Sequence, residues 1–172
     1  MLAAVVGAYL YLQSSQPGWW DRLLYPLAYT SIVRTDADDE HLDPALLAAV
    51  IYTESKFQPH VRSRTGAIGL MQLQPSTAEG IAIHTGGLRF RISDLYNPEI
   101  NIRYGAWYLR HLLDKYRDER VALAAYNAGQ ANVDRWRAES VGVQFPETRA
   151  YVARVESLKS IYRKAYGSKL GE

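Results

Sequence analysis

The chain contains no cysteine and has little net charge. The absence of cysteine from its 172 residues excludes disulfides, thiol catalysis, cysteine-ligated metal sites and a lipid-modified cysteine. A formal charge of +2 is too small to favour nucleic acid, so we expect no nucleic-acid partner. With 48% hydrophobic and 22% charged residues, and no internal repeat or low-complexity linker, the sequence predicts one globular domain that is held together by packing alone.

The sequence also lacks an obvious membrane span or cleavable leader. Residues 1–12 are uncharged and almost wholly apolar, but a helix of this length covers only about 18 Å of a core about 30 Å thick. Extending it to Trp20 crosses a polar stretch that contains Pro17. No basic segment precedes the run and no cleavage site follows it. We predict an uncleaved membrane anchor over residues 1–20. The alternative is a short apolar helix that packs on the domain.

A metal site is not indicated either. The acidic run at residues 36–40 lacks the glycine and the terminal glutamate of a calcium loop, which favours a solvated helix end. His111 has no second histidine at metal-ligand spacing. We therefore expect no metal and no cofactor.

A helix over residues 43–56 is the most informative segment that is present. Asp43 is a good N-cap, Pro44 suits the first helical position, and the following residues contain no glycine or further proline. Helical spacing places four side chains on one stripe, namely Leu47, Val50, Ile51 and Glu54. One carboxyl group therefore shares a face with three aliphatic side chains.

This position predicts an unusual acid at Glu54. A carboxylate against apolar surface loses hydration, so its pKa rises and it can act as a general acid near neutral pH. The alternative is a glutamate at the rim of the stripe, near a helix end. The loop at residues 63–75 follows, with two glycines that let a ligand approach the backbone and with glutamines whose amides can bind sugar hydroxyl or acetamido groups.

Four motifs in order resemble one family. Glu54-Ser55 is followed by GLMQLQPSTA, by the AYNAG segment at 125–129, and by Glu147-Thr148-Arg149 with Tyr151-Val152. Spread over residues 41–155, this pattern is similar to the soluble lytic transglycosylase catalytic domain. The resemblance implies a mainly α, lysozyme-like (goose-type-lysozyme-like) fold with at most a small β element, in a catalytic domain over residues 21–172.

Local signals give the expected elements of that fold. A helical pattern occupies residues 21–40, with Pro26 limiting its start, and further helices are expected at 98–116, from 118, at 131–138 and at 146–167. Leu88, Phe90 and Ile92 alternate with arginines, which fits a short strand or an extended loop.

The resemblance also implies a reaction. A lytic transglycosylase cuts the bond from N-acetylmuramic acid to N-acetylglucosamine in peptidoglycan with a single glutamate. That residue, here Glu54, protonates the leaving oxygen and then takes the proton of the muramyl 6-hydroxyl, which closes a 1,6-anhydro ring. By the same resemblance Ser63 and Gln72 are candidate partners of the acetamido group or of Glu54, and Met71 is a candidate wall of the cleft.

The later motifs supply the remaining candidates. Tyr126 and Asn127 would hold the muramyl sugar, although asparagine and glycine after a helix are also an ordinary helix stop. Glu147 and Tyr151, four residues apart, can face the same side and contact substrate. The alternative for Glu147 is a favourable interaction with the helix dipole.

Two rival functions remain open at this point. A goose-type-lysozyme-like hydrolase would use a related acid but add water, and a cell-wall-binding module would not cleave. For a transglycosylase or a hydrolase we expect a monomer in the cell envelope, with peptidoglycan as partner and the N-terminal segment in the membrane. The location of the substrate then places the catalytic domain on the extracytoplasmic side.

Overall fold

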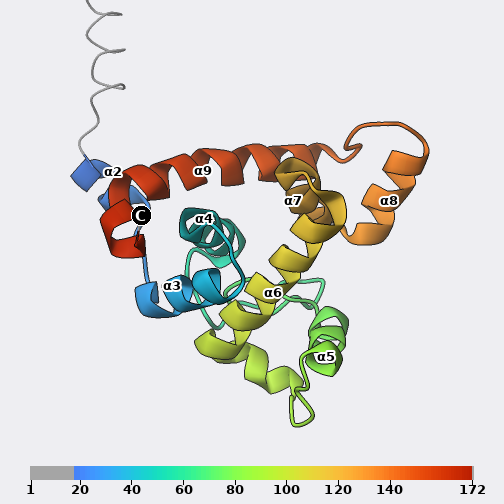
Figure 1. Cartoon of the computed structure of the whole chain (residues 1–172), viewed down its shortest axis with the longest axis horizontal. Coiled ribbons are helices and arrows are strands. Elements are labelled where there is room, and N and C mark those ends of the chain that lie inside the picture. Colours follow the sequence, from blue (N-terminus) through green and yellow to red (C-terminus); the bar gives the residue numbers. More distant parts are fainter. Residues whose placement is uncertain (1–17, 172) are drawn as a thin grey trace, which may run out of the picture.

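The structure is a computed structural model that describes residues 18–171, and the regular secondary structure of this part of the chain is helical (Figure 1). In chain order the elements are α2 (Gly18–Leu24), α3 (Thr30–Asp39), α4 (Pro44–Ser55), α5 (Pro75–His84), the 3-10 helix η1 (Ile92–Tyr96), α6 (Pro98–Tyr116), α7 (Glu119–Ala128), α8 (Gln130–Ala138) and α9 (Pro146–Leu170). No strand forms between residues 18 and 171, where only two isolated bridges occur, Arg62 to Ile68 and Ile68 to Leu73. The predicted mainly α fold is confirmed.

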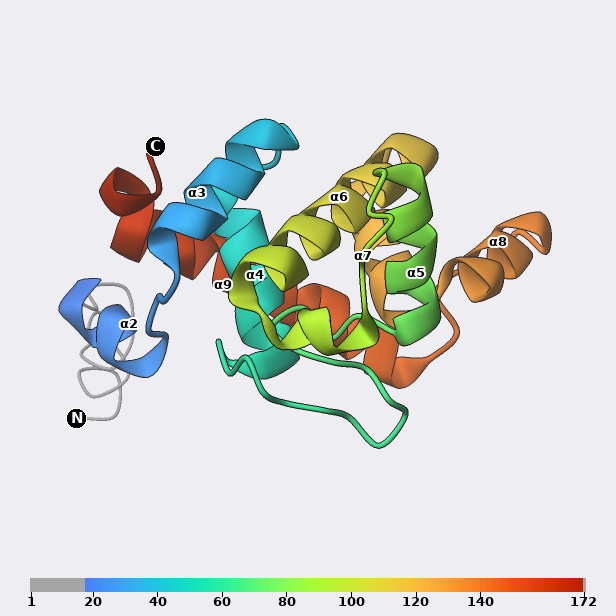
Figure 2. The same cartoon turned by 90° about the horizontal axis from the view of Figure 1, so that it is seen from below.

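Helix α4 is the centre of the domain. The Asp43 side chain accepts hydrogen bonds from the backbone N–H groups of Ala45 (2.9 Å) and Leu46 (3.3 Å), so the predicted N-cap is confirmed. Every residue from 45 to 51 is buried, because α3, α6 and α9 surround the helix (Figure 2). The predicted single apolar stripe was therefore too narrow. A helix that is apolar on all sides lies inside the protein.

Two further local predictions were wrong. The pattern over residues 21–40 forms two helices instead of one, and the break contains Pro26 and ends at Tyr29, which adopts a left-handed conformation (φ 54°). The final helix does not stop at Gly167. It continues to Leu170, where Gly171 (φ 90°) caps it, because Tyr166 and Leu170 are buried in the core.

The extended segment around residue 90 is a turn. The N–H of Phe90 bonds to the carbonyl of Gly87 (3.0 Å), and Leu88 is 96% exposed while Phe90 packs on Tyr104 (5.2 Å between ring centroids). Of the two predicted alternatives, a short strand or an extended loop, the structure has the loop and no strand forms at these residues.

The predicted anchor over residues 1–20 lies largely outside the described residues. Helix α2 begins at Gly18 and continues across the expected boundary at residue 20. Within the described chain no helix is both long and apolar enough to cross a membrane.

Candidate active site

Glu54 lies in the last turn of α4, beside the point where the helix is fixed to the following loop. Lys56 ends the helix in a left-handed conformation (φ 53°). The buried Ser55 hydroxyl lies 2.7 Å from the Leu70 carbonyl and 3.2 Å from the Ile51 carbonyl, and as a donor it ties the loop at 56–74 to the helix. The motif's serine is thus structural, and it fixes the position of the neighbouring acid.

Burial sets the acidity of Glu54. The side chain is half-buried, and the loss of hydration raises the pKa of its carboxyl from 4.5 to about 7. At neutral pH the group therefore exists in comparable amounts as acid and as carboxylate. A group with this property can donate a proton in one step and accept one in the next.

Two tyrosines from distant segments lie beside this carboxyl. The Tyr151 hydroxyl is buried and makes no hydrogen bond of ordinary geometry to a described residue, yet it is close enough to Glu54 to lower the carboxyl pKa against the larger rise from burial. Burial, with the Glu54 charge as a lesser cause, raises the pKa of both Tyr126 and Tyr151 well above 10. Both phenols therefore remain protonated, and the Tyr151 hydroxyl is available as a donor to the carboxylate.

The loop of the second motif is held by α6. The Asn101 amide is fully buried, and it donates to the carbonyls of Ile68 (3.0 Å) and Leu95 (2.8 Å) while its oxygen accepts from the Met71 N–H (2.8 Å). A Cβ on Gly69 would lie 2.2 Å from the Asn101 amide nitrogen, so this close approach requires glycine. Nothing in the local pattern marked Asn101 as the residue that shapes the loop.

Met71 connects that loop to the tyrosines through its backbone. Its side chain is fully buried and packs against Gly105, where an added Cβ would lie 2.2 Å from the sulfur. We predicted this side chain as a wall of the cleft, but it faces the core. The Met71 carbonyl accepts a hydrogen bond from the Tyr126 hydroxyl (2.8 Å), which positions that ring.

The two polar side chains of this loop that we predicted as site residues make their hydrogen bonds within the loop itself. The Gln72 amide nitrogen donates to the carbonyls of Gly69 (2.8 Å) and Val61 (3.2 Å). The Ser63 hydroxyl accepts from the N–H of Ala67 and lies 2.9 Å from the Thr65 hydroxyl. Neither has a described hydrogen bond to Glu54, and both shape the loop.

The last motif separates into an inner and an outer part. Tyr151 is buried next to Glu54, whereas Glu147 is exposed in the first turn of α9. Between them Thr148, which is 1% exposed, donates its hydroxyl to the Asn127 side-chain oxygen (2.8 Å). This bond orients the exposed Asn127 amide, and sequence reasoning did not assign Thr148 that part.

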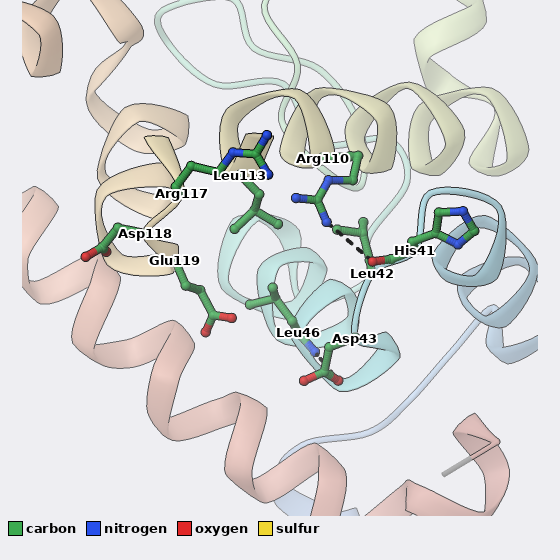
Figure 3. A pocket seen from close by; sticks show the side chains of 9 residues that line it. All are labelled: His41, Leu42, Asp43, Leu46, Arg110, Leu113, Arg117, Asp118 and Glu119. Carbon is green, nitrogen blue, oxygen red and sulfur yellow. Dashed lines mark hydrogen bonds between the residues drawn. The ribbon is translucent and has the colours of Figure 1, made fainter. Parts of the chain in front are cut away.

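Figure 3 shows a pocket of about 340 Å³ at the opposite end of α4 from Glu54. Its lining includes Leu46, Arg110 and Glu119, and at its edge Lys159 bridges Glu119 (2.7 Å) and Asp43 (3.3 Å). These ion pairs join α4, α7 and α9, so we interpret this hollow as part of the scaffold. The candidate site rests on the environment of Glu54 instead.

Between residues 18 and 171 no group of three histidine, cysteine or acidic side chains could hold a metal ion.

Comparison with known proteins agrees with this geometry. The sequence model of the family described as "Transglycosylase SLT domain" matches residues 31–148. The soluble lytic murein transglycosylase of Salmonella typhimurium is 34% identical over 169 residues, which cover 87% of this chain and 25% of that protein. The membrane-bound lytic murein transglycosylase C of Histophilus somni is 38% identical over 117 residues, which cover 62% of this chain and 32% of that protein.

A solved structure shows the same fold. The 70 kDa soluble lytic transglycosylase SLT70 of Escherichia coli superposes with a TM-score of 0.79 and 28% identity over 89% of this chain and 29% of that one. The chain thus spans about a quarter to a third of the length of these relatives. Because the family model covers more than two thirds of the sequence, this chain belongs to the transglycosylase SLT domain family.

Proposed function

We propose that this domain is a lytic transglycosylase that cleaves peptidoglycan between N-acetylmuramic acid and N-acetylglucosamine. The single observation that carries the proposal is the Glu54 carboxyl, whose pKa burial raises to about 7 beside two protonated tyrosines. Similarity to proteins named soluble and membrane-bound lytic murein transglycosylases supports the same reaction class.

In the first step Glu54 acts as the acid. Its proton moves to the glycosidic oxygen, the bond from that oxygen to C1 breaks, and positive charge develops at C1. The substrate's own acetamido group can share this charge, so a second carboxylate is not required. The carboxylate left on Glu54 is then stabilised by the Tyr151 hydroxyl, because a hydrogen bond to the charged form lowers the pKa.

In the second step the same carboxylate acts as the base. It takes the proton of the muramyl 6-hydroxyl while that oxygen bonds to C1, which closes the 1,6-anhydro ring and regenerates the acid. No water is consumed. Because nucleophile and electrophile belong to one sugar, the step avoids the entropy cost of positioning a separate molecule, an advantage of several kcal/mol.

Mass spectrometry of digested peptidoglycan tests the reaction. Anhydro-muramyl ends, which are lighter by one water than reducing ends, support the proposal. Reducing ends would identify a goose-type-lysozyme-like hydrolase instead. Glu54→Gln should lose at least about 1,000-fold in turnover because the general acid is removed. The matched control is Glu79→Gln, which makes the same change at an exposed position on α5 and should retain turnover.

The Glu54 variant also distinguishes a module that only binds. Cleavage by Glu54→Gln at the rate of the unmodified protein would refute the assignment of the acid. Binding of peptidoglycan without any cleavage by the unmodified protein would support a cell-wall-binding module.

We further propose that the protein acts in the cell envelope, with residues 1–20 as a membrane anchor and the catalytic domain on the extracytoplasmic side. The membrane-bound relative and the uncharged sequence of residues 1–12 support this placement. Washing isolated membranes at alkaline pH tests the anchor. Retention of the full chain in the pellet, with release of a variant that lacks residues 1–17, is the expected result.

A further inference from the structure

Helix α2 turns its apolar side outward. Trp20, Leu23 and Leu24 have the spacing of one helical stripe, and they are 40%, 68% and 48% exposed. In a soluble domain such a stripe ordinarily faces the core. We call this outward stripe the α2 face.

The α2 face is held in this orientation by the body of the domain. On the inner side the Arg22 guanidinium donates to the Ala165 carbonyl (2.9 Å), and the Tyr166 hydroxyl donates to the Tyr25 carbonyl (3.1 Å). Figures 1 and 2 show α2 beside the C-terminal end of α9 in both views. The outward stripe is therefore a fixed surface feature.

Basic side chains lie around this face. Lys164 and Lys169 are exposed on the end of α9 that is adjacent to α2. Asp21 offsets part of this charge through an ion pair with Lys164 (3.6 Å). An apolar stripe among cations matches the chemistry of a lipid surface with anionic headgroups.

We propose that the α2 face rests on the surface of a bilayer that contains anionic lipids and thereby fixes the orientation of the catalytic domain. The order of the sequence favours a bilayer over a protein partner or a second copy, because the uncharged apolar residues 1–12 lie only a few residues before α2. The leucines enter the boundary between headgroups and acyl chains, Trp20 lies at headgroup depth, and the cations contact phosphates.

One hydrogen bond connects α2 to the helix that carries the candidate active site. The Tyr52 hydroxyl donates to the Leu24 carbonyl (3.0 Å), and Tyr52 precedes Glu54 by two residues on α4. The end of α4 that carries the acid is therefore tied to the face on the bilayer. If the proposed function holds, this geometry directs cleavage to glycan strands at a fixed height above the membrane.

The absence of cysteine allows a direct test on the full chain. A nitroxide is attached at Leu23→Cys, or at the control Leu88→Cys, which is 96% exposed on the turn between α5 and η1. The protein is added to vesicles of phosphatidylcholine with about one quarter anionic phosphatidylglycerol. The rates at which the nitroxide collides with oxygen and with a charged nickel chelate then report how deep the label lies in the bilayer. We expect the chelate collision rate at residue 23 to fall about tenfold, because a charged complex is excluded from hydrocarbon, and the rate at residue 88 to stay unchanged.

The outcomes separate the possible occupants and do not depend on catalysis. Equal chelate access at both labels on vesicle-bound protein would overturn the proposal, because residues 1–17 alone would then hold the protein. Immobilisation of the residue 23 label without vesicles, increasing with protein concentration, would identify a second copy instead. The double variant Lys164→Gln, Lys169→Gln should restore chelate access at residue 23, whereas Arg64→Gln with Arg89→Gln, at exposed positions on distant loops, should not.

Discussion

Replacement of Glu54 by glutamine should stabilise the fold at alkaline pH, because the native carboxyl ionises at a cost. Its pKa is about 7 in the folded chain and 4.5 without the fold, so the folded state holds the proton more tightly and stability falls as pH rises from 4.5 to 7. Between pH 5 and pH 8 the two values give a loss of about 2.5 kcal/mol. Because the side chain keeps some contact with solvent, we expect about 2 kcal/mol.

Urea unfolding at 25 °C measures this difference. The free energy of unfolding is determined at pH 5, 6, 7 and 8 for the unmodified chain and for Glu54→Gln, and the difference between the two is plotted against pH. The other titrating groups are common to both proteins and cancel in that difference. Glu79→Gln removes an exposed carboxyl and should give a difference that changes by less than about 0.5 kcal/mol over the same range.

The way this stability difference changes with pH tests whether the fold buries the Glu54 carboxyl. A difference that grows in favour of glutamine and levels off above pH 7 matches a carboxyl buried by the fold. If the free energies of unfolding of the two proteins instead change with pH in parallel, so that their difference is constant, Glu54 is fully hydrated in the folded protein. The acid would then lack the raised pKa on which the proposed reaction depends.

Three other changes probe the surroundings of the site. Tyr151→Phe removes a group that lowers the Glu54 pKa, so the alkaline limit of activity should move up by about one pH unit or less, as a pH–rate profile will show. Gly105→Ala places a methyl group 2.2 Å from the Met71 sulfur and should cost about 1–3 kcal/mol in urea unfolding. Burial raises the pKa of the Asp36 carboxyl to about 6, so ionisation of this group destabilises the fold at alkaline pH. Asp36→Asn should therefore raise the free energy of unfolding at pH 8 by about 1 kcal/mol after allowance for solvent screening, and the gain should vanish near pH 4.

Helix boundaries set by local chemistry could be predicted from the sequence. The Asn97 side chain caps α6 by accepting from the Glu99 N–H (2.9 Å), and Asp118 caps α7 by accepting from the Val121 N–H (3.0 Å). Each bond joins residues two or three positions apart, so the pattern contains the whole interaction. Both helices begin where those residues indicated.

Boundaries that depend on distant packing could not be predicted in this way. Gly167 carries a strong local stop signal, but α9 passes through it because Tyr166 and Leu170 are buried against the core, and Gly171 supplies the left-handed cap four residues later. The cost of one glycine inside a helix is about 1 kcal/mol. Burial of a tyrosine and a leucine outweighs that cost.

The same distinction applies to the candidate site. Spacing along one helix placed Glu54 against apolar neighbours, and this was sufficient to predict a raised pKa. The groups that make the carboxyl usable come from segments far along the chain: Tyr126 is aligned by the Met71 carbonyl, and Met71 is held in turn by Asn101. Such a chain of contacts has no local signature, because each link joins residues about 30 to 55 positions apart. A raised pKa at Glu54 can therefore be predicted from the spacing along one helix, whereas the groups that surround its carboxyl require the folded chain.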